Sequence, residues 1–213
     1  NYAYNDMYFK SGAVFGNGEG TIYVKERGLG VAGCEINKKI VFDCGTTWGQ
    51  LTGLKAYSGE STLKRKVTFS DRNFNIYPYS GSRLTFKGGF EGAGYLLFQE
   101  SGGGVVEFAD EPVSLSYPVT FWEAHRTSSG GYCIEIILWS PGNIFSAFGH
   151  NESQKRYFTS CKLSTTVDWA FDNPAMKMHI GADSLWDLCG TSQRVGHLNA
   201  NSLNYNSSQG TMT

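Results

Sequence analysis

The chain has few charged residues, and neither sign of charge dominates. Charged side chains make up 17% of its 213 residues and the net charge is −1, whereas soluble domains average roughly 25% charged residues. Nucleic acids are bound by basic surfaces, so this balance argues against a nucleic-acid partner. The sequence also lacks the apolar run of about 18 residues that a membrane span needs, so we expect no membrane partner.

The usual signatures of metal and catalytic sites are also missing. There is no CxxC pair, and the histidines lack HxH or HExxH spacing, so we expect no metal site and no cofactor. These histidines are His125, His150, His179 and His197. No GxSxG elbow marks a serine nucleophile. The glycine cluster Gly88–Gly94 lacks the spacing of a phosphate-binding loop and is interpreted as a turn between strands.

Carboxylate pairs are the remaining route to an enzyme. Asp168 with Asp172, or Glu107 with Glu111, could in principle form the two-acid site of a glycosidase. Acidic residues are common enough to pair by chance, so these pairs carry little information. We predict that the chain is not an enzyme and has no catalytic residue.

Glycine and aromatic residues are abundant. The chain has 27 glycines and 15% aromatic residues, a composition that fits strands and tight turns better than helices. Short apolar segments, bounded by turn residues, follow one another at intervals of roughly 8 to 12 residues, which indicates a sandwich or a barrel. No internal repeat is apparent. We predict one all-β domain over residues 1–205, with 206–213 as an exit strand or a linker to a further domain.

Two segments give specific predictions. The apolar run from Tyr132 to Trp139 reads as a strand buried on both faces, and it is followed by a turn at residues 140–143. The segment 173–182, NPAMKMHIGA, is ambiguous, because Asn173 before Pro174 could begin a helix. The alternation of Met176, Met178 and Ile180 favours a strand.

The segment 61–70, STLKRKVTFS, alternates with one interruption. Leu63, Val67 and Phe69 lie on one face of a strand with period two, and Arg65 falls on that same face. A charged side chain in the middle of an apolar face predicts that the strand begins near an edge or an end at this point.

Five cysteines are present, and their spacing does not match a zinc site. Cys34 and Cys44 flank a segment of hairpin length, and Cys133 and Cys161 flank the apolar run and the strand that follows. We favour the disulfides Cys34–Cys44 and Cys133–Cys161, formed in an oxidising compartment. Cys189 would then be unpaired, either as a small buried hydrophobe or bonded to a partner outside this chain.

Two polar loops contain groups that suit neutral sugars. Amides and carboxylates exchange hydrogen bonds with hydroxyl groups, and an aromatic ring covers the C–H face of a pyranose. The first loop has Ser140, Asn143 and Asn151, and the second has Asp168, Trp169, Asp172 and Asn173. Singly, each has a structural alternative: Trp139 and Trp169 as core residues, and the asparagines as turn formers.

These loops carry a resemblance to a known family. The segments EIILWSPGNIFS (135–146) and RYFTSCKLSTTVDW (156–169) resemble the receptor-binding (lectin) domains of bacterial chaperone–usher fimbrial tip adhesins, the N-acetylglucosamine-binding ones in particular. The resemblance is confined to this part of the chain, and Pro141-Gly142-Asn143 stands where the family has an Asp-Thr pair. It implies an elongated immunoglobulin-like β-sandwich with long loops, which binds host glycans and continues into a pilin domain.

From these observations we expect a carbohydrate-binding adhesin domain that attaches a bacterial fimbria to host glycans. The chain begins at Asn1 without an initiator Met, as a processed secreted protein would, so we expect a location at the fimbrial tip on the cell surface. Its partners would be a host glycan or glycoprotein and a following pilin domain or fimbrial subunit. The alternatives are a phage tail or receptor-binding structural protein and, third, a secreted glycan-cleaving enzyme.

Overall fold

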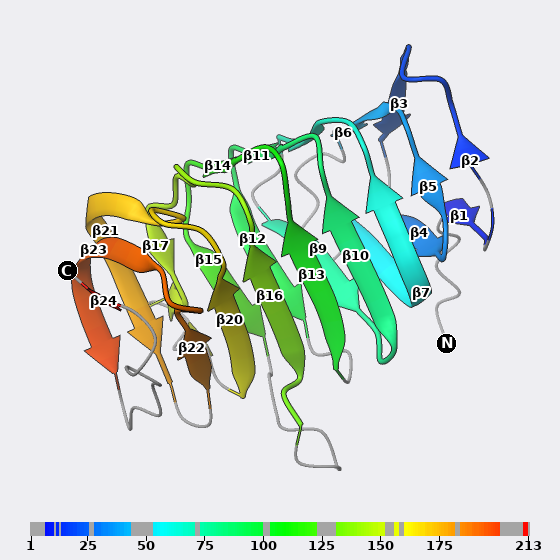
Figure 1. The fold of residues 1–213 in the computed structure, drawn as a ribbon. Helices are drawn as coiled ribbons and strands as arrows, with labels where there is room; N and C mark the ends of the chain where they lie inside the picture. Colours follow the sequence, from blue (N-terminus) through cyan, green and yellow to red (C-terminus); the bar gives the residue numbers. More distant parts are fainter. Residues whose placement is uncertain are drawn as a thin grey trace.

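The computed structural model shows a β-solenoid, not an immunoglobulin-like sandwich. It describes residues 7–10, 12, 14–25, 28–43, 53–70, 73–99, 103–122, 131–151, 156–157, 160–181, 184–200 and 211–212. These residues form no helix, and their strands pair in parallel through about seven stacked turns. Figure 1 shows the turns stacked side by side from the N-terminus to the C-terminus. The predicted all-β class is correct, but the predicted sandwich is wrong.

The described strands form three sheets, A, B and C, that run along the solenoid, and sheet C ends at β14 while sheets A and B continue. Sheet A contains β1 (Met7–Phe9), β4 (Gly28–Ala32), the first part of β7 (Gly53–Leu63), β9 (Asn73–Pro78), β12 (Tyr95–Gln99), β15 (Val119–Trp122), β17 (Ala147–Phe148), β21 (Asp172–Ile180) and β23 (Ser192–Ala200). Sheet B contains β2 (Val14–Phe15), β5 (Glu35–Ile36), the second part of β7, β10 (Ser82–Phe86), β13 (Gly104–Phe108), β16 (Ile134–Leu138), β20 (Cys161–Thr165) and β22 (Leu185–Asp187). Sheet C contains β3 (Thr21–Val24), β6 (Lys39–Phe42), β8 (Val67–Phe69), β11 (Phe90–Gly92) and β14 (Val113–Leu115).

Two further pairings complete the described strands. A short antiparallel hairpin joins β18 (His150–Asn151) to β19 (Arg156–Tyr157). At the C-terminal end, β24 (Thr211–Met212) pairs in parallel with the start of β23. These two residues lie within the predicted exit segment, whose other residues lie outside the described part of the chain.

The strands that pair are one solenoid turn apart in sequence. Leu84 pairs with Val106, and Gly59 pairs with Ser82, so the length of a turn is nearly the same in these two cases. The next pair in the same column is Val106 with Ile136. The solenoid turn between these two residues is longer, because an additional segment separates its strands. Parallel strands need a crossover connection, and here the rest of each turn provides it.

Residues in the left-handed backbone region turn the chain from sheet A into sheet B. Gly59, Gly81 and Gly103 lie at this corner in successive turns with φ of 64°, 74° and 107°, and Ser160 has a φ of 53° at the same corner further on. A glycine adopts such angles without steric cost. The solenoid corners thus account for part of the glycine-rich composition.

The interior of sheet B consists of two columns of side chains that follow the solenoid axis. Pairing across the turns aligns Ser61, Leu84, Val106, Ile136, Leu163 and Trp186 in one column, and Leu63, Phe86, Phe108, Leu138 and Thr165 in the other. All of these side chains are buried, and most are apolar. The rings of Phe86 and Phe108 stack with centroids 5.0 Å apart, within the range of favourable aromatic pairs.

Several local predictions are confirmed. The apolar run 132–139 contains the predicted strand, β16, and the turn after it has Gly142 at a φ of 72°. The predicted burial on both faces is wrong, because Glu135 is half-buried and Trp139 is exposed on the outer face. The ambiguous segment after Asn173 is strand β21, as favoured. The interruption at Arg65 marks the exposed corner between β7 and β8, which agrees with the predicted strand boundary.

The predicted disulfide Cys133–Cys161 is wrong. The two sulfur atoms lie 3.2 Å apart, whereas a disulfide bond is about 2.0 Å long. Both are buried on neighbouring turns, where the parallel register places Cys161 opposite Ile134 and not opposite Cys133. No disulfide bond joins the described cysteines, which are Cys34, Cys133, Cys161 and Cys189. Cys44, the predicted partner of Cys34, lies outside the described residues.

Candidate functional site

The first predicted sugar-binding loop forms a buried corner. Ser140 and Asn143 are only 1% and 2% exposed. The Asn143 amide nitrogen donates to the carbonyl oxygens of Ser140 (2.6 Å) and Ala170 (2.9 Å), and its side-chain oxygen accepts from the Val113 backbone N–H (2.8 Å). This amide therefore joins the backbones of three successive turns.

The second predicted loop lies directly against the first. The backbone N–H of Gly142 donates to the Trp169 carbonyl (2.9 Å), and that of Asn143 donates to the Ala170 carbonyl (3.2 Å). Asp168 accepts a hydrogen bond from the Ser192 backbone N–H (2.7 Å). The structure thus brings the two loops together, as a shared site would require.

The remaining predicted residues make local contacts. Asp172 forms an ion pair of 2.5 Å with Arg194 on the next turn. Asn173 donates to the Phe145 carbonyl (3.1 Å) and accepts from the Ala175 backbone N–H (2.9 Å). Asn151 lies in β18, and its side chain is outside the described part of the structure.

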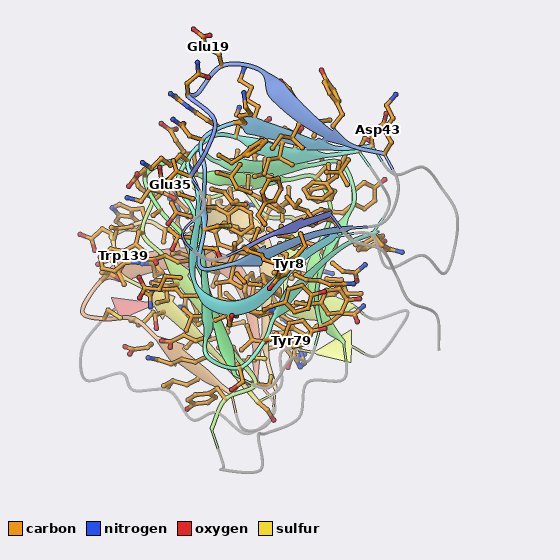
Figure 2. All side chains as sticks on the ribbon, turned by 90° about the vertical axis from the view of Figure 1, so that its right-hand side faces the viewer. Tyr8, Glu19, Glu35, Asp43, Tyr79 and Trp139 are labelled. Atoms are coloured by element: carbon orange, nitrogen blue, oxygen red, sulfur yellow. The ribbon has the colours of Figure 1, made fainter. Side chains whose placement is uncertain are left out.

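The indole rings of Trp139 and Trp169 are exposed rather than in the core. They are 47% and 43% exposed, and they lie on successive turns at the corner where sheet B passes into sheet C. We call this corner the B–C edge and define it by residues 37–39, 64–66, 87–89, 109–111, 139–142 and 166–169. In Figure 2, Trp139 projects from the same side of the molecule as Glu35, away from Tyr79.

A register column explains how Trp139 is presented. Backbone hydrogen bonds continue the pairing of sheet B one residue beyond its strands, so Asn37, Lys64, Lys87, Ala109, Trp139 and Thr166 follow one another across the turns. These positions alternate with the buried columns and therefore face outward. Ala109 has a small side chain, so the surface is depressed between the longer side chains of Lys87 and Trp139.

A shallow hollow of about 470 Å³ lies at this low point. Its lining residues are Glu60, Thr62, Arg83, Thr85, Lys87, Glu107, Ala109, Asp110 and Trp139. The Arg83 guanidinium and the Thr85 hydroxyl both donate to one Glu107 carboxylate oxygen, each at 3.0 Å. This network fixes charged and hydroxyl groups beside an exposed aromatic ring.

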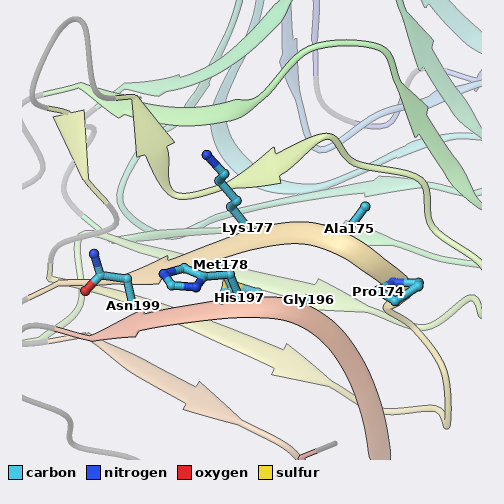
Figure 3. A pocket seen from close by; sticks show the side chains of 7 residues that line it. All are labelled: Pro174, Ala175, Lys177, Met178, Gly196, His197 and Asn199. Carbon is cyan, nitrogen blue, oxygen red and sulfur yellow. The ribbon is translucent and has the colours of Figure 1, made fainter.

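A second hollow of about 330 Å³ lies on sheet A between β21 and β23. Figure 3 shows its lining residues along the two strands, with His197 and Lys177 on directly paired positions. Its lining contains no aromatic ring other than the imidazole and no carboxylate. It therefore offers fewer types of contact than the hollow beside Trp139.

The buried thiols are poor nucleophiles. Burial raises the pKa of Cys161 well above its usual range, and a hydrogen bond with Cys133 raises it further. Burial likewise raises the pKa of Cys34. Cys189 is exposed, but partial burial and the nearby Asp187 raise its pKa as well. A thiol with a raised pKa carries little thiolate at neutral pH, and the thiolate is the reactive form.

No group of three or more potential metal ligands occurs among the described residues. The same residues contain no helix that is long and apolar enough to cross a membrane. Comparison with protein-family models, curated proteins and solved structures gives no match for this chain. The proposals below therefore depend on the geometry of the site.

Sequence reasoning named Glu107 only as a chance pair with Glu111, and it missed most of the other residues that line the hollow. Arg83 and Lys87 are well separated from Glu107 in the sequence and belong to no motif. A search for one constant spacing could have found part of the set, because Arg83 and its partner Val105 have the same separation as Lys87 and Ala109.

Proposed function

We propose that the chain is a non-enzymatic carbohydrate-binding protein that holds a glycan along the B–C edge. The observation that carries the proposal is the exposed ring of Trp139 beside a hollow lined by fixed polar groups. An exposed indole covers the C–H face of a sugar ring, while the polar groups exchange hydrogen bonds with its hydroxyls. The exposed Trp169 on the next turn extends the same surface.

The solenoid repeat suits an extended ligand. Neighbouring parallel strands lie roughly 4.8 Å apart, which is close to the length of one pyranose unit in a linear glycan. A sugar chain that follows the solenoid axis would therefore place successive units on successive turns. A shallow surface of this kind binds each unit weakly and gains strength from the number of units.

The biological setting is a separate proposal. Attachment of a fimbria to host glycans, a following pilin domain and a location at the bacterial surface were expected from the family resemblance. The fold that this resemblance implied is wrong, so the proposal of glycan binding depends on the B–C edge alone. The phage tail alternative would use the same surface for receptor glycans.

Titration of the purified chain with a panel of neutral and acidic oligosaccharides tests the function. We expect binding to at least one glycan, and Trp139→Ala should weaken it by about tenfold or more, as is typical of a central aromatic contact. Tyr23→Ala is the matched control, since Tyr23 is an exposed aromatic residue on sheet C. The proposal fails if no glycan binds, or if Trp139→Ala binds as tightly as the unchanged chain.

Glycan cleavage is the second candidate, because three carboxylates line the hollow. Glu60, Glu107 and Asp110 surround it, and glycosidases use two such groups. Incubation with the glycans that bind, followed by an assay for new reducing ends, separates the two functions. If the unchanged chain produces new reducing ends and Glu107→Gln does not, the chain is an enzyme and the binding proposal is wrong.

A further inference from the structure

Lysine and arginine side chains gather in a larger hollow further along the B–C edge. This hollow has a volume of about 630 Å³, and its lining residues are Asn37, Lys39, Lys64, Arg65, Lys66, Lys87, Gly88, Asp110 and Glu111. Five of these residues are cationic and two are anionic. The chain as a whole has a net charge of −1, so this local excess of positive charge differs from the balance of the whole chain.

The cations are placed against one another across the turns. Lys87 lies directly opposite Lys64, since the Lys87 backbone N–H donates to the carbonyl of Leu63 just before it (2.9 Å). Lys39 likewise lies opposite Lys66, one residue before the paired strands continue. Like charges directly opposite each other destabilise a sheet. A cost of this kind, repeated on neighbouring turns, is typical of a functional surface.

Carboxylates of the protein neutralise some of these cations. The ion pairs are Lys64 with Glu35 (2.6 Å), Lys66 with Glu91 (2.6 Å) and Lys87 with Asp110 (4.0 Å). The last pair is long, so the Lys87 ammonium group keeps room for a further anionic partner.

Lys39 and Arg65 have no ion-pair partner among the residues that the structure describes. The Arg65 Nε donates to the neutral side-chain oxygen of Asn37 (3.0 Å), which orients the guanidinium without cancelling its charge. Both side chains are exposed. Two uncompensated cations therefore face solvent at this hollow.

The floor of the hollow has no side chain at Gly88. A Cβ atom at this position would lie 2.4 Å from the backbone of Arg65, so only glycine lets the two turns approach this closely. The Arg65 side chain is exposed, and its guanidinium extends from beside this floor towards Asn37 and Gly18. A planar guanidinium forms paired hydrogen bonds with a carboxylate.

The cationic hollow is continuous with the hollow beside Trp139, because Lys87 and Asp110 line both. We propose that the glycan held along the B–C edge is an acidic polysaccharide whose uronate carboxylates bind Arg65, Lys39 and Lys87. This inference depends on the proposed function and specifies its ligand class. The sugar rings contact Trp139, and the carboxylates of further units occupy the cationic hollow.

A uronate chain fits better than a nucleic acid. A uronate polymer carries one negative charge for each sugar unit, close to one for each solenoid turn. Asp110 and Glu111 line the same hollow on the turn that follows Lys87, and their charges would repel the denser charge of a phosphate backbone. Nucleic-acid sites usually show a continuous basic face instead.

The test is calorimetric titration of the full chain, in a chelator to remove divalent cations, with two matched probes. One is hexagalacturonate, and the other is its carboxyl-reduced form, in which each carboxylate is a primary alcohol. We expect hexagalacturonate to bind about tenfold or more tightly than the reduced form, with an advantage that falls as salt is added. Arg65→Gln and Lys39→Gln should each weaken hexagalacturonate binding by about fivefold to tenfold and leave binding of the reduced form unchanged.

Lys177→Gln is the control, because Lys177 is an exposed lysine that lines the separate hollow on sheet A. It should bind hexagalacturonate as the unchanged chain does. Equal affinity for the two probes, or no effect of either B–C edge substitution, overturns the acidic-ligand inference and leaves the proposed function standing. Binding of neither probe nor any panel glycan overturns both. Tighter binding of a thymidine oligonucleotide than of hexagalacturonate would replace the polysaccharide by a nucleic acid.

Discussion

At the scale of single residues, polar side chains at the corners hold the turns together. The Asn143 amide bonds to backbone groups of Val113, Ser140 and Ala170, and Gln193 has a similar role two turns later. The Gln193 side chain accepts from one backbone N–H and donates to one carbonyl of the preceding turn, each at 2.8 Å. Buried amides of this kind satisfy backbone groups that the strands leave unpaired.

The first prediction separates a structural role of Asn143 from a ligand-binding role. Asn143→Ala would leave the Val113 N–H and two buried carbonyls without this partner, so it should lower the free energy of unfolding by about 3 kcal/mol. Chemical denaturation measures this change. Glycan affinity of the folded variant should stay unchanged, and lost affinity at unchanged stability would restore Asn143 as a ligand-binding residue.

The second prediction concerns pH and Cys161. Burial raises the pKa of this thiol in the folded state above its value in the unfolded chain. Its contribution to stability is therefore complete below the unfolded pKa and is lost as the pH rises towards the folded pKa. The free energy of unfolding should fall from neutral to alkaline pH, and less steeply in Cys161→Ala. An equal slope in both proteins would show that another group causes the loss.

At the scale of elements, the charged network on sheet B shows how register creates a surface. Lys162 on β20 forms an ion pair with Glu135 on β16 (2.8 Å). Burial lowers the pKa of Lys162, but this pair and the nearby Asp187 outweigh the effect, and the net pKa is raised. Such side chains meet because parallel pairing places residues of successive turns in direct contact.

The third prediction tests the packing of β10. Phe86→Ala removes a ring that stacks on Phe108 and should cost about 4 kcal/mol of stability. Phe86→Leu should cost only about 1 kcal/mol, because leucine occupies the same column at Leu63 and Leu138. Denaturation of the two variants gives the comparison. Equal losses would show that the column does not share one packing environment across the turns.

The elements themselves could be predicted from the sequence better than their pairing. Alternation found β21 and the corner at Arg65, because the period-two pattern reflects which side of a strand is buried. Pairing depends on a repeat of one solenoid turn, and the length of that repeat changes where longer segments interrupt it, as before Ile136. Residues at corresponding positions of successive turns are all buried but differ in type, as Ser61 and Trp186 do in one column. The repeat is therefore not visible in the sequence.

At the scale of the whole molecule, stacking of the solenoid turns brings residues without a sequence motif into one line on the surface, where we propose that a glycan binds. Trp139, Lys87 and Lys64 belong to different turns, yet they follow one another along one column. The candidate site could be predicted only in part: the sequence indicated Trp169 and its loop, and it placed Trp139 among alternatives for the core. The cationic residues acquire a common role only when the turns are stacked.

The most direct measurement follows the indole N–H signals of tryptophan-labelled protein by NMR during titration with hexagalacturonate. The chain has five tryptophans, and single substitutions to phenylalanine assign their signals. We predict that the signals of Trp139 and Trp169 shift with saturation while that of the buried Trp186 stays in place. Saturable glycan binding that leaves the Trp139 signal unmoved would contradict the account.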